Sequence, residues 1–461
     1  MHIQFLGGTD TVTGSKHLVV AAGCRLLRDM GMFQGRRQEA DAINRRLPVE
    51  PDRLDHVLIS HAHIDHCGML PLLAARGYKG PVHATRATAA LCEIMLKDAA
   101  HIQESDAAYL NQKANRKGMD PVIPLFTMRD AEQAVSLFRG HAYHEAIELA
   151  PGFTMTAFDA GHILGSALTA FDLRENGRSA RVGYAVDLGR FGLPLIRDPE
   201  TMAPVDVLVI ESTYGNRRHA DAARAEDQLL DVTQRTLARG GKVIIPSFAL
   251  ERAQEVIYHL SELILQGRLR QVPVYLDSPM AAAVSKVFDD HPEYLDEASR
   301  KQYAALGCLT CPPWVRLSTT VADSRAITAS AEPAIVIAAS GMCEHGRILH
   351  HLKHGIGSPD NTVVLVGYQA QHTLGRRLQE GETEVRIFGE MHTRRAAVES
   401  LSAFSAHADC DDLVRYVKAA RPRRTFLVHG EQEQREALAA ALREQGLGEV
   451  FLPREGDVVD L

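Results

Sequence analysis

The stretch Ser60-His61-Ala62-His63-Ile64-Asp65-His66 brings three imidazoles and one carboxylate together in a short segment. It follows residues 56–60 (HVLIS), an apolar run that predicts a buried strand. A turn after a strand can fold alternate side chains inward, and imidazole nitrogen and carboxylate oxygen are ligands that zinc prefers. The stretch therefore predicts a two-metal site, with His61 and His63 on one ion and Asp65 and His66 on a second ion roughly 3.5–4 Å away.

Two further ligands are predicted later in the chain. His162 lies within Asp159-Ala160-Gly161-His162-Ile163-Leu164-Gly165-Ser166, between two strand-like runs, and Asp187 follows the strand-like residues 181–186. Residues at such strand ends are commonly presented into a cleft. We expect His162 to complete the ligands of the first ion and Asp187 to bridge both ions.

The composition is that of an ordinary globular protein. The chain has 461 residues, 45% apolar and 24% charged, which is enough for two domains. We expect a cytoplasmic protein without a membrane segment, because no apolar run reaches the roughly 18 residues of a membrane span and the N-terminal residues do not resemble a signal peptide. The net charge of −7 argues against a broad basic surface for nucleic acid. It does not exclude a nuclease, because bound cations add positive charge inside a cleft.

The middle of the chain predicts a second α/β unit. Short apolar strands alternate with helical stretches there, which indicates a parallel sheet with helices around it. The predicted strands are residues 242–245, 272–276, 334–338 and 362–366.

The order of the motifs resembles the metallo-β-lactamase superfamily. Asp29 comes first, followed by His61–His66, His162 and Asp187. The resemblance implies an αββα sandwich fold. It also implies that Asp29 supports the site without binding metal, which fits the need of a ligand histidine for a carboxylate on its other nitrogen.

Three later motifs resemble the β-CASP branch of that superfamily. They are Glu211 in Ile210-Glu211-Ser212-Thr213-Tyr214-Gly215, His407 in Ser405-Ala406-His407-Ala408-Asp409, and His429 in Val428-His429-Gly430-Glu431. The resemblance is to bacterial and archaeal relatives of the pre-mRNA 3′-end cleavage endonuclease. It implies a metallo-β-lactamase domain in two parts, 1–210 and 387–461, with an α/β β-CASP domain inserted at 211–386.

The same resemblance implies a zinc-dependent ribonuclease that cuts within single-stranded RNA by a hydroxide held between two zinc ions, with 5′-to-3′ exonuclease action left open. His429 would be the seventh ligand, Asp65 would also hold the attacking hydroxide, and His407 would be the general acid, held by Glu211. DNA-directed relatives usually lack a histidine at the position of His429, which favours RNA. Relatives are often dimers, but the sequence leaves the oligomeric state, including a homodimer, open.

Two other functions stay open at this point. A small-molecule ester or thioester hydrolase of the same fold would need neither the 211–386 insert nor Glu211 and His407. A non-catalytic partner subunit of an RNA-processing complex would be expected to have lost ligands, and all seven are present.

RNA contacts are expected in the inserted region. A backbone turn with exposed N–H groups can bind phosphate, and aromatic side chains can stack on bases. The candidates are Ser247, Phe248, Ser340, Gly341, Met342, Gln369, Thr373 and Arg376. Glu344 departs from the family pattern and would repel a phosphate if it faced the groove.

The seven cysteines are dispersed, which does not indicate a disulfide framework. Cys308 and Cys311 form a single Cys-x-x-Cys pair, followed by Pro312-Pro313. Without a second such pair a structural zinc site is not indicated, and we expect two small, partly buried side chains.

Overall fold

The computed structural model describes residues 1–115, 120–202, 204–219, 223–401 and 405–461. The chain divides into two compact units. Unit 1 comprises 1–191, 198–218 and 407–461, and unit 2 comprises 192–197 and 219–406. Among the described residues, no helix is both long enough and apolar enough to span a membrane.

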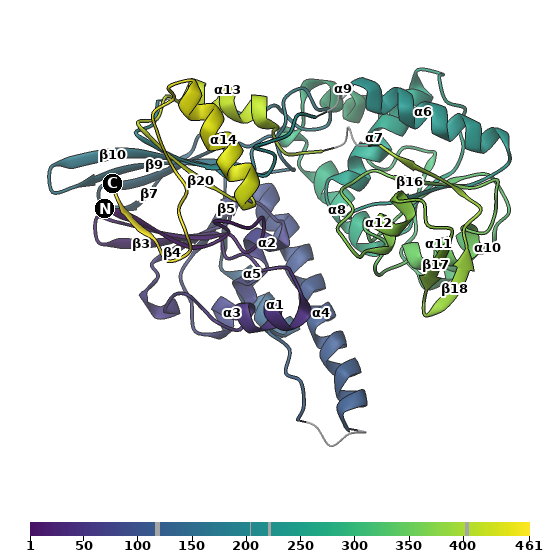
Figure 1. Ribbon diagram of the computed structural model, residues 1–461, viewed down its shortest axis with the longest axis horizontal. Coiled ribbons are helices and arrows are strands. Elements are labelled where there is room, and N and C mark those ends of the chain that lie inside the picture. The colour runs from purple at the N-terminus through teal and green to yellow at the C-terminus, as the bar shows by residue number, and fades with distance from the viewer. Residues whose placement is uncertain (116–119, 203, 220–222, 402–404) are drawn as a thin grey trace. The chain divides into compact units, whose positions relative to one another are not determined.

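Unit 1 contains two sheets with helices on their outer faces (Figure 1). In its described residues, each sheet has seven strands. The first runs, in spatial order, β22 (Val458–Asp460), β1 (His2–Gly7), β2 (Lys16–Ala21), β3 (Cys24–Arg28), β4 (His56–Leu58), β5 (Val82–Thr85) and β6 (Phe138–His141). The second runs β21 (Glu449–Phe451), β20 (Arg424–Val428), β11 (Val207–Glu211), β10 (Arg178–Ala185), β9 (Ala167–Glu175), β8 (Phe153–Asp159) and β7 (Ala146–Ala150).

Alternating side chains of the strands explain the layers of unit 1. In β11, Val207 and Val209 pack into the core between the sheets, whereas Leu208 and Ile210 pack toward helices. The helices on that outer face are α13 (Cys410–Ala420) and α14 (Gln432–Glu444). The other outer face carries α1 (Arg37–Asn44), α2 (Ile64–Cys67), α3 (Leu70–Ala75), α4 (Arg86–Asn115) and α5 (Met128–Ser136), with a 3-10 turn at Pro51–Arg53. The predicted αββα sandwich is confirmed.

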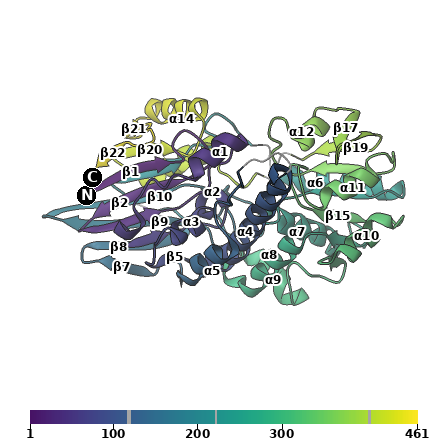
Figure 2. The ribbon, with the colours of Figure 1, turned by 90° about the horizontal axis from the view of Figure 1, so that it is seen from below.

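Unit 2 is built around a parallel sheet (Figure 2). Its strands lie in the order β14 (Val315–Leu317), β13 (Val274–Leu276), β15 (Ile335–Ala338), β12 (Val243–Pro246), β16 (Thr362–Leu365) and β19 (Ala397–Ser400). A hairpin, β17 (Glu384–Ile387) and β18 (Glu390–Thr393), stands apart from it. The parallel sheet predicted from four strands is confirmed, and β14 and β19 extend its two edges.

Helices cover both faces of this sheet. Val243 and Ile245 pack on one face, and Ile244 packs on the other, as period-two alternation requires. The helices are α6 (Ala223–Ala238), α7 (Arg252–Leu265), α8 (Pro279–Asp290), α9 (Glu297–Leu306), α10 (Val321–Ala329), α11 (Ile348–Gly355) and α12 (Leu374–Gln379), with a 3-10 turn at Pro292–Tyr294.

The limits of the compact units differ from the expected domain boundaries. Unit 2 begins at His219, apart from the short segment 192–197, and extends to Ala406, whereas we expected the insert at 211–386. The reason at the later boundary is sheet pairing, since all four residues of β19 pair with β16. The domain boundaries at 210 and 386 stay predictions.

Cys308 and Cys311 form a disulfide, which the dispersed cysteines did not indicate. Their sulfurs are joined in a disulfide, with the two Cα atoms 5.7 Å apart. The other five cysteines are free thiols.

Candidate metal centre

The ends of several strands of unit 1 carry the predicted site residues. Strands β10, β11 and β20 run parallel, so their carboxyl ends meet at one edge, where Asp187, Glu211 and His429 lie. His162 follows β8, which ends at the same edge because both β8 and β10 are antiparallel to β9. The remaining imidazoles come from the opposite sheet, in the segment after β4 and on α2.

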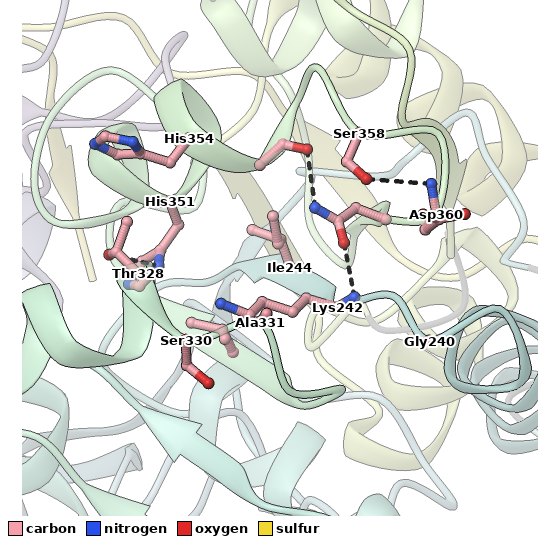
Figure 3. A pocket seen from close by; sticks show the side chains of 13 residues that line it. Gly240, Lys242, Ile244, Thr328, Ser330, Ala331, His351, His354, Ser358 and Asp360 are labelled. Atoms are coloured by element: carbon pink, nitrogen blue, oxygen red, sulfur yellow. Dashed lines mark hydrogen bonds between the residues drawn. The ribbon is translucent and has the colours of Figure 1, made fainter.

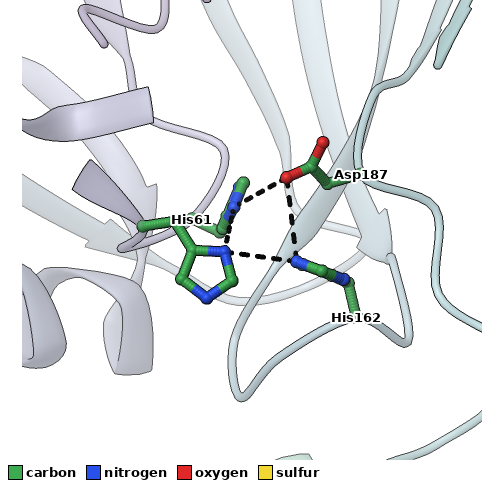
Figure 4. Close-up of side chains that lie close together, drawn as sticks. His61, His162 and Asp187 are labelled. Atoms are coloured by element: carbon green, nitrogen blue, oxygen red, sulfur yellow. Dashed lines mark hydrogen bonds and ion pairs between the residues drawn. The ribbon is translucent and has the colours of Figure 1, made fainter. Parts of the chain in front are cut away.

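A first group of donors surrounds one point (Figure 4). His63 Nδ1 lies 3.1 Å from His61 Nε2 and 3.3 Å from His162 Nε2. Asp187 Oδ2 lies 3.1 Å from His61 Nε2 and 3.7 Å from His162 Nε2. These four residues offer ligand atoms that all lie within 4.8 Å of one another.

A second group adjoins the first through Asp187. His66 Nε2 lies 3.4 Å from His429 Nε2 and 4.0 Å from Asp65 Oδ2. Asp187 reaches this group as well, with Oδ2 3.2 Å from His66 Nε2 and Oδ1 3.0 Å from His429 Nδ1. The seven side chains thus fall into the same two sets that we expect for two ions, with Asp187 between them.

Asp29 supports this arrangement from behind. Its side chain is fully buried and accepts hydrogen bonds from His66 Nδ1 at 2.8 Å, Arg28 Nη1 at 2.7 Å and the hydroxyl of Ser60 at 3.0 Å. Burial alone would raise the pKa of Asp29, but Arg28 and His66 outweigh it and hold this pKa well below its ordinary value. Asp29 therefore stays ionised, and its hydrogen bond with Nδ1 of His66 turns Nε2 of His66 toward the centre.

The charges at the centre favour a bound cation. Burial is the main cause that lowers the pKa of His61, His63 and His162, so these imidazoles are neutral near pH 7 and offer lone pairs. Burial would also lower the pKa of His66, but the carboxylates of Asp187 and Asp29 outweigh it and raise that pKa well above the ordinary value. The position beside His66 Nε2 therefore attracts positive charge, from a proton or from a metal ion.

Three of the site residues adopt a backbone conformation that sequence inspection does not reveal. Asp29, Asp187 and His429 each have a positive φ, of 61°, 58° and 51°. Each directly or almost directly follows a strand, so the left-handed turn takes its side chain out of the strand direction and into the centre. Such conformations cost energy in residues other than glycine and are concentrated at functional sites.

Two glycines that the sequence analysis did not single out bring the loops of the centre together. A Cβ atom on Gly189 would lie 1.7 Å from the carbonyl oxygen of Gly161, next to His162. A Cβ atom on Gly31 would lie 1.6 Å from the carbonyl oxygen of Asp65. Neither contact is possible, so both positions require glycine. Their place two residues after Asp187 and Asp29 is the sequence signal that could have found them.

His407 and Glu211 form a pair beside the first group. His407 Nδ1 lies 3.2 Å from Glu211 Oε2, and the His407 ring centre lies 4.5 Å from that of His162. Glu211 is fully buried and also accepts the backbone N–H of Leu188 at 2.5 Å, whereas the His407 side chain is 23% exposed. Burial would lower the pKa of His407, but the charge of Glu211 and its hydrogen bond outweigh it and raise this pKa to about 9. His407 is therefore a protonated imidazole at neutral pH.

Three family models match successive parts of the chain. The metallo-beta-lactamase superfamily domain matches residues 18–189, the Beta-Casp domain matches 253–378, and the Zn-dependent metallo-hydrolase RNA specificity domain matches 391–453. Ribonuclease TTHA0252 of Thermus thermophilus is 38% identical over 461 residues and covers both chains completely. This chain belongs to the β-CASP branch of the metallo-β-lactamase superfamily.

Other β-CASP relatives are longer. The transcription termination factor FttA of Pyrococcus horikoshii is 35% identical over 463 residues, which span 96% of this chain and 68% of that protein. A crystal structure of a protein of unknown function from Enterococcus faecalis V583 covers the whole chain with a TM-score of 0.56 at 14% identity, so it shares the fold. The zinc-dependent family and the two donor groups together indicate a metal cofactor in unit 1.

The candidates for RNA binding lie at or just after the carboxyl ends of strands in unit 2, which contains the Beta-Casp match and is called the β-CASP unit below. The polar side chains of several candidates are already hydrogen-bonded to the backbone. Gln369 is buried, and its amide donates to the carbonyl oxygens of Gly341 and Gly367, both at 3.0 Å. The Ser340 hydroxyl accepts the backbone N–H groups of Glu344 and His345 at 3.1 and 3.3 Å. These side chains therefore shape the turn and do not project from it.

The other candidates fall into a capping residue, two turn residues and two exposed side chains. The Thr373 hydroxyl accepts the N–H of Arg376 at 3.2 Å and so caps α12. Ser247 is buried, Met342 is half-buried, and the ring of Phe248 fills the space where a side chain on Gly341 would lie. Phe248 is 41% exposed and the Arg376 side chain is 38% exposed.

Glu344 is exposed and holds the start of α12. Its Oε1 accepts the backbone N–H of Leu374 at 2.6 Å, at the start of α12. The carboxylate of Glu344 therefore stabilises the start of α12 within the β-CASP unit.

A pocket of about 250 Å³ lies at the opposite edge of the same sheet (Figure 3). Its lining includes Lys242 and Asn361, which come directly before β12 and β16, and His351 on α11. None of the RNA-binding candidates lines it in the described part of the chain. In open parallel sheets ligands bind at the carboxyl ends of the strands, so this pocket is not the expected site.

Proposed function

We propose that this chain is a zinc-dependent ribonuclease that hydrolyses phosphodiester bonds within single-stranded RNA, with two zinc ions held in unit 1. The observation that carries the proposal is the convergence of seven side chains on two adjoining points, with the His407–Glu211 pair at their side. The name and full-length similarity of the Thermus ribonuclease support RNA as the substrate.

The donor set fits zinc. Asp29 accepts the Nδ1–H of His66, so Nε2 of His66 faces the carboxylate oxygen of Asp187 at 3.2 Å. Two acceptors at this distance repel each other unless a positive charge lies between them. Imidazole and carboxylate together are borderline ligands that suit zinc better than magnesium or calcium.

The residues of the chain then take distinct roles. Zinc ions lower the pKa of coordinated water and stabilise the negative charge that develops on a phosphate. Asp187 holds the two donor groups at a fixed separation, and Asp65, which is 20% exposed, lies at the open side where the attacking water is held. His407 donates its Nε2 proton to the leaving oxygen, and Glu211 keeps the ring oriented and protonated.

The two other functions explain less. A small-molecule ester or thioester hydrolase leaves the β-CASP unit and the His407–Glu211 pair without a role. A non-catalytic subunit leaves a complete set of inward-facing donors unexplained. Exonuclease action from a 5′ end and a homodimer remain part of the proposal, to be measured by product length and by light scattering.

In the β-CASP unit we assign RNA contact to Phe248 and Arg376. Both are partly exposed beside turns at the carboxyl ends of parallel strands, and the guanidinium of Arg376, whose Nε is paired with Glu380 at 2.6 Å, would exchange this partner for an RNA phosphate. Gln369, Ser340 and Thr373 act indirectly, because they hold the turns that present these two side chains.

The test compares a labelled single-stranded RNA with a DNA of the same sequence, with the zinc content of the protein measured. We expect internal cuts in RNA, little cutting of DNA, and loss of cutting after chelation that added zinc restores. Zinc-loaded protein that cuts neither strand but hydrolyses esters or thioesters would overturn the proposal.

A further inference from the structure

Unit 2 contains a second group of metal-ligating side chains, in the β-CASP unit and apart from the residues of the metal centre. Asp289 lies in the last turn of α8, and Cys308 and Cys311 follow α9. A carboxylate oxygen of Asp289 and the two sulfurs lie within 4.8 Å of one another. Cys311 is exposed, so solvent reaches this end of the loop.

The loop that carries the sulfurs is held to Asp289 without help from the disulfide. Asp289 Oδ1 accepts the backbone N–H groups of Leu309 and Thr310 at 2.8 and 3.4 Å, and Oδ2 accepts the Thr310 hydroxyl at 2.9 Å. Leu309 and Thr310 are each 1% exposed. When the disulfide is reduced, these bonds keep the two thiols beside the carboxylate.

A structural role for the disulfide is weak. A disulfide stabilises a fold mainly by restricting the unfolded chain, and the effect grows with the length of the loop that it closes. Cys308 and Cys311 close a loop with a sequence separation of three, which is already fixed by Asp289. Stabilising the fold therefore does not explain why the two sulfurs lie beside Asp289.

The spacing and chemistry suit a soft divalent cation. Cys-x-x-Cys is the spacing by which paired thiolates bind one zinc ion. Two thiolates at about 2.3 Å from a tetrahedral ion lie nearly 4 Å apart, which a Cα separation of 5.7 Å accommodates. Asp289 supplies a third, anionic ligand, and the exposed side of Cys311 leaves a fourth position to water.

We propose that reduced Cys308 and Cys311 bind a zinc-like divalent cation together with Asp289, and that the disulfide form of the pair does not bind it. In the reductive step, a phosphine and water convert the disulfide into two thiols and a phosphine oxide, so two electrons pass from phosphorus to sulfur. Binding of the cation then releases the two thiol protons. The inference does not depend on the proposed ribonuclease activity.

Cobalt(II) gives a test that is specific to this site. Thiolate-to-cobalt charge transfer absorbs in the near ultraviolet, whereas the donors of unit 1 are only imidazole and carboxylate. The full chain, reduced with a phosphine, should develop this absorption with the intensity of one thiolate-bound cobalt per chain, whatever further cobalt the imidazoles and carboxylates of unit 1 bind. The oxidised chain should not develop it.

Matched variants identify the ligands. The double substitution C308S/C311S should abolish the absorption, and D289N should weaken cobalt binding about tenfold or more. Cys410→Ser, at a half-buried free cysteine, should leave the absorption unchanged. The zinc content of unit 1 serves as the check that each variant is folded.

Three results would overturn the inference. They are no charge-transfer band in the reduced chain, a band that survives C308S/C311S, and unchanged cobalt affinity in D289N. If C308S/C311S fails to fold, alkylation of the reduced, folded wild-type chain replaces it. Alkylation should abolish the band, and a band that persists when both thiols are blocked would count against the site in the same way.

Discussion

The two units position their candidate residues alike and use them differently. In unit 1, Asp187 and His429 follow parallel strands, and in unit 2, Ser340 and Gln369 do so as well. The polar atoms of unit 1 face one another around two points, whereas those of Ser340 and Gln369 are bound to the backbone of their own turns. A polar residue at a strand end is thus placed by the fold, but its hydrogen bonds decide whether it is free for a ligand.

The largest effect is expected from Asp65→Ala. It removes a metal ligand and the group that holds the attacking water, so RNA cleavage should fall by about 10³-fold or more. Cleavage assays with measured zinc content test this, with Asp106→Ala as the control because that carboxylate is 63% exposed on α4. Normal cleavage by the Asp65 variant would show that the donors of unit 1 are not the catalytic centre.

His407→Ala should separate catalysis from metal binding. The loss of a general acid reduces the rate by about 10²–10⁴-fold, and zinc content should stay at the wild-type level. Loss of zinc from this variant would instead make His407 a ligand.

Glu211→Gln tests the role of the His407–Glu211 pair through the pH dependence of kcat. The Glu211 charge raises the pKa of His407, which must be protonated to act, so activity falls as the pH rises through that pKa. Without the charge, the alkaline fall in kcat should begin at a lower pH. An unchanged alkaline limb would mean that another group donates the proton.

Gly189→Ala tests how closely the strand ends of unit 1 must approach. The new Cβ displaces the Gly161 carbonyl and with it His162, so we expect an unfolding free energy lower by about 1–3 kcal/mol and weaker zinc binding. Gly357→Ala is the control in unit 2, where the nearest atom lies at 3.9 Å. Denaturant titration and metal analysis should find both defects in the Gly189 variant alone.

Two substitutions in unit 2 test the other half of the comparison. Gln369→Ala leaves the turn carbonyls of Gly341 and Gly367 without their donor and should cost about 1–3 kcal/mol of stability. Arg376→Ala removes an exposed side chain and should raise KM for RNA several-fold while stability changes by less than about 1 kcal/mol. The reverse pattern would place Gln369, and not Arg376, on the RNA.

An effect on stability alone is expected from a buried imidazole of unit 1 outside the centre. His17 lies between Phe5 and Tyr184, and neither ring nitrogen has a hydrogen-bond partner among the described residues. Burial, followed by the charge of Arg28, lowers its pKa from 6.5 to about 3, so only the unfolded chain takes up a proton between these values. Folding is then less stable as the pH falls, by about 2 kcal/mol at pH 5. In His17→Phe this part of the loss should vanish, as denaturant titrations at pH 7 and 5 would reveal.

The sequence predicted more of the metal centre than of the β-CASP unit for a physical reason. His61, His63, Asp65 and His66 lie within one turn, so their residue types and spacing already restrict the chemistry. The distant partners His407 and His429 came from resemblance to a family. No local sequence pattern predicted the positive φ of Asp187 or the need for glycine at 189. Both depend on segments that are distant in sequence and adjacent in the fold.

In unit 2, the residue type did not predict which polar side chains are available to contact RNA. Gln369 and Glu344 were expected to contact or repel RNA, and both instead bind backbone groups of the unit. The strand predictions succeeded there because burial on both faces gives continuous apolar runs. The disulfide was missed because two cysteines in an otherwise dispersed set carry no signal of their redox state.

The pairing of β11 with β20 has a consequence for synthesis on the ribosome. Strand β20 and the residues His407 and His429 emerge only after the whole of unit 2. Until then β11 is an edge strand, the second donor group lacks an imidazole, and Glu211 has no histidine to orient. The growing chain therefore carries most of the donor groups in an incomplete form, and the segment that follows unit 2 completes them.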